Sequence, residues 1–156
     1  MTRFALILAL AAPLPVLAGE IGPHAVTYDE YGAIEEPLTD RPGDPEAGVV
    51  VMTTRGDGNC IACHRVAALE EYPFHGEVGP PLDGVAAYRS AAELRGIVAN
   101  AKQMFPGTVM PAFYKSEGFT RPGDGFTGEA ATEPLPPLLT AQQIEDVVAF
   151  LMTLTE

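Results

Sequence analysis

The stretch that decides the fold is GDGNCIACHR, residues 56–65. Cys60 and Cys63 stand two residues apart, and His64 follows the second cysteine directly. These are the two cysteines of the 156-residue chain. Paired cysteines at this spacing occur in disulfides, zinc sites, redox dithiols and covalently attached haems, so the rest of the sequence has to discriminate among these four.

The spacing C-x-x-C-H is typical of a c-type haem attachment site. Two thiols add across the two vinyl groups of one porphyrin, and two intervening residues allow both sulfur atoms to reach them. The residue after the second cysteine then lies beneath the iron, which makes His64 the expected proximal ligand. We therefore predict one covalent haem c, held by Cys60 and Cys63. This attachment leaves no thiol for nucleophilic chemistry.

The other readings of the motif fit the sequence less well. A structural zinc site needs about four protein ligands, and neighbours such as Cys63 and His64 rarely bind one metal without strain. His24 and His75 are the only further histidines in the sequence. A redox dithiol is expected between a strand and a helix, whereas this motif follows a polar GDGN segment with no strand pattern upstream.

The sixth iron ligand is expected to be a methionine. Met52 and Met152 lie on predicted helical faces among apolar neighbours, where core packing is the ordinary role of methionine. Met104 and Met110 lie in the loop sequence QMFPGTVMPAFY. Pro111 restricts the backbone of Met110 to extended conformations, and a stiff loop can present a thioether to the iron. Met110 is the favoured ligand and Met104 the alternative.

A histidine/methionine pair raises the reduction potential of a haem and leaves no coordination site for a substrate. The predicted chemistry is therefore one-electron transfer rather than oxygen activation. A haem sensor or a peroxidase would instead need an open or labile sixth position.

The second ring nitrogen of His64 needs a hydrogen-bond acceptor, because such a bond fixes the orientation and tautomer of a ligating imidazole. The segment EVGPPLDGV, residues 77–85, follows the motif. Pro80 has no N–H, and its carbonyl is a free acceptor on a rigid loop. We predict that the Pro80 carbonyl accepts this hydrogen bond; an ordinary Pro-Pro turn is the alternative.

The first residues, MTRFALILALAAPLPVLAGE, have the pattern of a secretory signal peptide. Arg3 gives a short positive end, and residues 4–12 form an unbroken apolar run. Val16 and Ala18 are small residues at the two positions that a signal peptidase reads. The run is too short to span a bilayer. We expect cleavage after residue 18 and a periplasmic protein without membrane insertion.

The formal net charge of −12 argues against nucleic acid or an anionic membrane surface as partner, because phosphate-rich surfaces bind Lys and Arg. A basic or mixed protein surface is the better expectation. Fifteen prolines and sixteen glycines indicate many loops.

The chain divides into a signal peptide at 1–18, an extended amino-terminal arm at 19–43 and one domain at 44–156. We predict a first helix that begins at Asp44 and Pro45 and runs into the haem segment.

Two further helices are predicted from their capping boxes. One covers residues 90–102 and starts with Ser90 and Glu93, and the other covers residues 140–156 and starts with Thr140. A polar, Gly/Pro-rich insertion at 119–138 separates them. The expected fold is an all-α domain with long loops packed around one covalent haem.

The order of these parts resembles a class I cytochrome c over about residues 44–156. A helix, CIACH, a GP-containing loop, a helix, a Met-Pro loop and a carboxyl-terminal helix follow one another. The segments GNCIACH, VGPPL and MPAFY and the acidic arm also resemble the SoxX family, the small monohaem subunits of SoxAX cytochrome complexes. By this pattern, Cys60 and Cys63 hold the haem, and His64 and Met110 bind the iron.

The resemblance to SoxX implies a reaction and its partners. In that family the subunit forms a heterodimer with SoxA, a c-type cytochrome that carries the catalytic haem. The pair couples thiosulfate oxidatively to a cysteine of the SoxYZ carrier protein in bacterial sulfur oxidation. The small subunit passes the released electrons to a soluble electron-acceptor cytochrome. The chain would then be the non-catalytic electron-transfer subunit of an L-cysteine S-thiosulfotransferase; a free diffusible periplasmic electron carrier is the alternative.

Overall fold

The computed structural model describes residues 19–120, 122–123, 127–131 and 135–156. The predicted signal peptide and parts of the predicted insertion lie outside these residues. The α-helices of the described part are α1 (Pro45–Thr53), α2 (Ala91–Asn100) and α3 (Ala141–Leu151). Short 3-10 helices are η1 (Pro23–Ala25), η2 (Cys60–Ala62), η3 (Ala67–Leu69) and η4 (Val85–Ala87). Extended pairing in the described residues is limited to isolated bridges, so the predicted all-α class is confirmed.

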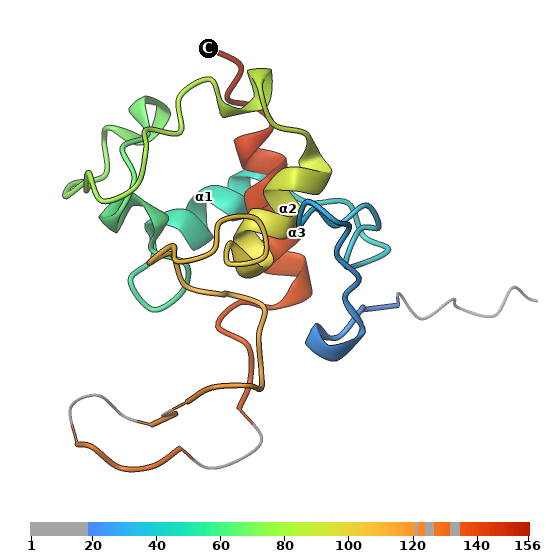
Figure 1. Ribbon diagram of the computed structural model, residues 1–156. Helices are drawn as coiled ribbons and strands as arrows, with labels where there is room; N and C mark the ends of the chain where they lie inside the picture. The colour runs from blue at the N-terminus through green and yellow to red at the C-terminus, as the bar shows by residue number, and fades with distance from the viewer. Residues whose placement is uncertain (1–18, 121, 124–126, 132–134) are drawn as a thin grey trace, which may run out of the picture.

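The helix α3 is the central element, because both α1 and α2 pack against it (Figure 1). The crossing of α1 and α3 is especially close at Gly48, where any side chain would overlap the carbonyl oxygen of Asp146. The Asp146 carboxylate also accepts a hydrogen bond from the Asp44 backbone N–H, at 2.9 Å. The start of α1 is therefore fixed directly to the middle of α3.

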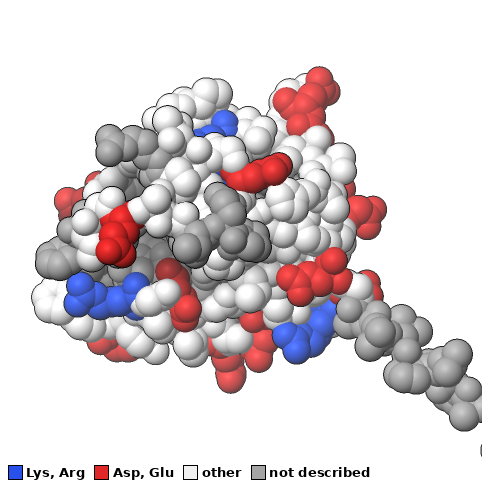
Figure 2. Space-filling view, turned by 90° about the horizontal axis from the view of Figure 1, so that it is seen from below, with Lys and Arg blue, Asp and Glu red and all other residues white. Residues whose placement is uncertain are grey.

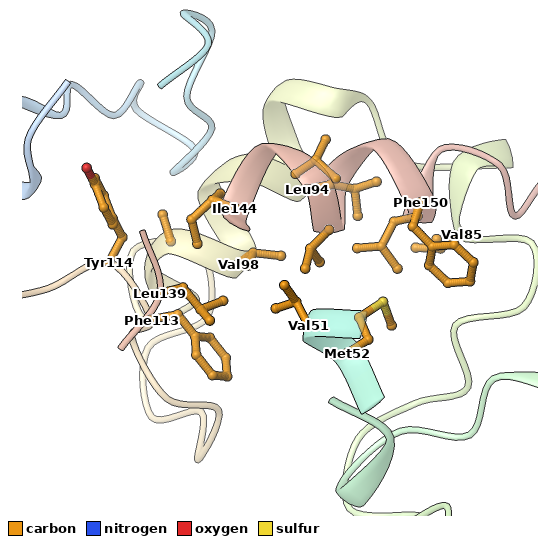
Figure 3. Packing of buried hydrophobic residues seen from close by; sticks show 14 of the residues in the cluster. Val51, Met52, Val85, Leu94, Val98, Phe113, Tyr114, Leu139, Ile144 and Phe150 are labelled. Atoms are coloured by element: carbon orange, nitrogen blue, oxygen red, sulfur yellow. The ribbon is translucent and has the colours of Figure 1, made fainter. Parts of the chain in front are cut away.

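The space between the three helices is filled by one hydrophobic core (Figure 3). Met52 and Ile144 are fully buried, and Val51 and Val98 are nearly so. Phe113 joins this core from the loop that follows α2. The core thus connects the helices to the loop that carries the candidate methionine ligand.

The predicted helix starts are confirmed. The Ser90 and Thr140 side chains each accept a hydrogen bond from the backbone N–H three residues on, and both capping boxes are complete. The Asp44 carboxylate caps α1 by accepting from the Glu46 N–H, at 2.9 Å.

The predicted helix ends are wrong. The helix α1 ends at Thr53 and does not run into the haem segment. Residues 55–58 form turns that lead to Asn59, which has a left-handed conformation with φ of 45°. The helices α2 and α3 also end earlier than predicted, at Asn100 and Leu151. Met152 follows the end of α3 and is 37% exposed, so its predicted place in the core is also wrong.

The arm at 19–43 packs onto the helical domain, with Ile34 and Leu38 buried. Its backbone passes so closely over α2 that a side chain at Gly96 would overlap the carbonyl oxygen of Gly32. An antiparallel bridge between Glu20 and Thr39 closes the arm on itself.

A buried ion pair holds the arm in place. The Arg95 guanidinium donates two hydrogen bonds to the Glu145 carboxylate, at 2.7 and 3.1 Å, and both side chains are buried. Arg95 also donates to the Ile34 carbonyl at 2.7 Å, and Glu145 accepts from the Leu38 N–H at 2.8 Å. The side chains of this pair, one from α2 and one from α3, therefore provide hydrogen-bond partners for two backbone groups of the arm.

We predict that Glu145→Ala lowers the free energy of unfolding by about 3–5 kcal/mol, because it leaves a buried guanidinium without its counter-charge. Denaturant unfolding monitored by circular dichroism measures this change. The control is Glu117→Ala, which removes an exposed carboxylate 3.2 Å from His24 and should have a much smaller effect. Equal losses in the two variants would contradict the role assigned to the ion pair.

Candidate haem attachment site

Cys60, Cys63 and His64 lie on a single tight turn. The backbone N–H groups of Cys63 and His64 both donate to the Cys60 carbonyl, at 3.1 and 3.0 Å. The intervening Ile61 is buried in the core, whereas Ala62 is exposed. This anchoring by Ile61 fixes the turn on the domain and leaves the two sulfur-bearing residues on the same short element.

The two thiols are not joined in a disulfide and differ in environment. Cys60 is partly buried against the core, and Cys63 is exposed. Burial raises the pKa of the Cys60 thiol to about 12.

The His64 ring has a defined orientation and tautomer. Its Nδ1 lies 2.7 Å from the carbonyl oxygen of Pro80. A carbonyl oxygen can only accept, so Nδ1 carries the proton and donates it. In this tautomer of the neutral ring, Nε2 is the nitrogen that can bind a metal ion.

Gly79 lies against the face of the His64 ring, and sequence reasoning had not singled it out. A Cβ at this position would come 2.7 Å from His64 Nδ1 and 2.8 Å from Nε2. The Gly79 N–H also donates to the Cys63 carbonyl, at 2.8 Å. The signal that could have found it is its place directly before Pro80, whose carbonyl accepts the hydrogen bond from the ligating ring, because that ring needs room.

The other two histidines are engaged elsewhere. His75 accepts from the Val66 N–H through Nδ1, at 3.2 Å, and its Nε2 lies 3.0 Å from the Leu69 carbonyl oxygen. His24 contacts Ser116 and Glu117 in an exposed position. His75 thus holds the loop behind the motif closed, and neither residue offers a free ring nitrogen beside His64.

Met104 and Met110 have different surroundings. The Met104 Sδ lies 3.7 Å from an Arg89 guanidinium nitrogen, and its backbone lies against Gly32 of the arm. The Met110 side chain packs against the hydrophobic core that Cys60 also touches. The thioether of Met104 therefore has a partner on the α2 side, which favours Met110 as the sixth ligand.

The donor set fits a covalently bound haem. Two thiols and an imidazole with Nδ1 bound to a carbonyl come from one turn, and the lack of a side chain at Gly79 leaves room for the ring. In the described ranges, no group of three or more His, Cys, Asp or Glu side chains could hold a metal ion by itself. No helix in the same residues is long and apolar enough to cross a bilayer.

Comparison with known proteins identifies the family. The sequence pattern of the cytochrome c family matches residues 46–155. A chain in the crystal structure of SoxXA from P. pantotrophus is 60% identical, and the match covers 88% of this chain and 99% of that one with a TM-score of 0.83. A search of curated proteins gave no significant match. The chain therefore belongs to the cytochrome c family, and within it is a SoxX-like cytochrome c with a covalently attached haem.

Proposed function

We propose that this cytochrome is the electron-transfer subunit of a SoxAX complex that couples thiosulfate to a cysteine of a SoxYZ carrier protein. The observation that carries the proposal is the 60% identity to a chain of the SoxXA structure, over 99% of that chain. An identity this high over the whole length favours the same partner surface as well as the same fold.

The residues of the site have separate roles in this proposal. Cys60 and Cys63 hold the haem through thioether bonds, and His64 and Met110 bind the iron through Nε2 and Sδ. The Pro80 carbonyl keeps the imidazole in its metal-binding tautomer. When bound, the haem iron supplies reversible one-electron chemistry, and a His/Met ligand pair raises its potential.

This chain would have no free thiol after haem attachment, which bears on where the sulfur chemistry takes place. Both of its cysteines are used, so the cysteine that receives the thiosulfate sulfur lies on another chain. The oxidative coupling releases two electrons per new S–S bond, and a haem held by Cys60, Cys63, His64 and Met110 would supply a one-electron acceptor for them. A SoxA-type cytochrome supplies the catalytic haem, and a soluble cytochrome takes the electrons onward.

The charge of the surface suits a protein partner. Figure 2 shows one face of the molecule, on which acidic side chains are widely spread and Lys and Arg stand at fewer places. This agrees with the formal net charge of −12. Complementary charge on a basic or mixed partner would accelerate the encounter and make it sensitive to salt. The expected location is the periplasm, reached with the signal peptide predicted at residues 1–18.

The experiment that tests the function is isolation from the native periplasm, followed by turnover. We expect a stable one-to-one complex with a second c-type cytochrome, measured by mass and haem content. With partner, carrier and thiosulfate all present, the haem of this chain should become reduced. A monohaem monomer that reacts with several redox proteins would instead identify a free electron carrier.

Substitution of the proposed sixth ligand tests the site. We predict that Met110→Ala opens the sixth position, so that carbon monoxide binds the ferrous haem. The reduction potential should fall by about a hundred millivolts or more, because axial ligands tune haem potentials over about 0.8 V. The matched control is Met104→Ala, which should leave both properties close to those of the parent protein. The reverse result would make Met104 the ligand.

Substitution of Gly79 tests the support of His64. We predict that Gly79→Ala destabilises the haem-loaded protein by about 1–3 kcal/mol, since the added methyl group overlaps the imidazole ring. Thermal unfolding of the holoprotein, followed by haem absorbance, measures the loss. Gly56→Ala is the control, because a Cβ there has no atom within 4 Å. If both variants unfold at the same temperature, the ring does not need this glycine.

A further inference from the structure

We propose that Lys102 is a positioning residue that holds the backbone of Met110 in place for iron binding. This inference rests on the ligation by His64 and Met110 put forward above. Lys102 belongs to none of the sequence motifs and is not part of the haem attachment site.

The contact that carries the inference joins a side chain to the backbone of the proposed ligand. Lys102 Nζ donates a hydrogen bond to the Met110 carbonyl oxygen, at 2.6 Å. In the described part of the chain, no other donor reaches this oxygen. A bond of this length from an ammonium group is charge-assisted, and such bonds are stronger than those between neutral groups.

Other contacts complete the restraint on Met110. Its backbone N–H donates to the Thr108 hydroxyl, at 3.3 Å, so both of its polar backbone atoms are held by side chains. Pro111 restricts the Met110 backbone further. The direction in which the thioether leaves the loop is therefore set by three neighbouring side chains.

Backbone hydrogen bonds attach the loop to α2 on either side of Met110 but not at Met110 itself. It begins at the end of α2, where the Phe105 N–H donates to the Ala101 carbonyl at 2.8 Å. It returns to α2 at Tyr114, whose N–H donates to the Ala99 carbonyl at 2.9 Å. Lys102 lies near the start of this loop, and its hydrogen bond to Met110 connects the start of the loop to the residue that carries the proposed ligand.

The early part of the loop is held separately. The Arg89 guanidinium lies 5.6 Å from the centre of the Phe105 ring and 3.7 Å from the Met104 Sδ. These contacts fix the loop near α2 but do not reach Met110. Loss of Lys102 should therefore loosen the ligand-bearing end of the loop while the rest keeps its place.

The consequence is a change in how often the thioether leaves the iron. With the carbonyl released, the Met110 backbone can move and the iron–sulfur bond opens more often. An external ligand such as imidazole then enters the sixth position faster. The hydrogen bond is exposed, so an increase of roughly two- to tenfold is expected for its loss.

The experiment measures the rate at which imidazole displaces the sixth ligand from the ferric holoprotein. The long-wavelength absorbance band of methionine-bound ferric haem reports the same exchange. Lys102→Ala should accelerate displacement within the range given above, and Lys102→Arg should restore a rate near that of the parent protein. The control is Lys115→Ala, because Lys115 is the other lysine of the chain and donates to the Gly118 carbonyl instead.

Two results would overturn the inference. One is an unchanged displacement rate in Lys102→Ala while Met110→Ala still opens the sixth position. The other is an equal acceleration in Lys102→Ala and Lys115→Ala, which would assign the effect to lost positive charge and not to the contact. If Met110→Ala itself leaves the sixth position closed, the proposed ligation is wrong, and the role of Lys102 is overturned with it; this outcome differs from the first two because Met110→Ala, and not only Lys102→Ala, is then without effect.

Discussion

The packing of residues 79–80 against the cysteine–histidine turn is the constraint on which the rest of the site depends. The Gly79 N–H binds the carbonyl of Cys63, the Pro80 carbonyl binds the ring of His64, and a glycine at 79 leaves room for that ring. A turn of so few residues could not hold an imidazole at one angle by itself. The loop therefore fixes the orientation of the ring, with Nδ1 bound to the carbonyl and Nε2 left for a metal ion.

The proposed sixth ligand lies on a different part of the chain. The candidate ligand Met110 lies on a loop that leaves and rejoins α2, and the arm lies across the early part of this loop at Gly32 and Met104. The arm in turn is held by the pair of Arg95 and Glu145. The arm is therefore part of the packed domain, and it contacts the loop that carries Met110.

Much of this could be predicted from sequence because it depends on local chemistry. Capping boxes mark the helix starts at Ser90 and Thr140, and the motif at Cys60 specifies its own cofactor. The helix ends and Gly79 could not be predicted, because they depend on tertiary contacts. The end of α1 is set by the turn at Asn59, and Gly79 is required only because the His64 ring lies against it. Similarly, nothing local to Arg95 or Lys102 indicates that their partners lie in the arm and in the methionine loop.

The buried contact between the arm and α3 joins two parts of the chain that are far apart in sequence. Leu38 binds Glu145 across 107 residues of sequence, and α1 packs on the same late helix. The early half of the chain therefore has no stable place until α3 has been made, and contacts of such long range slow folding. The turn that carries Cys60 lies between Leu38 and Glu145 in sequence and packs on the same core, so its surroundings are complete only when the last helix is in place.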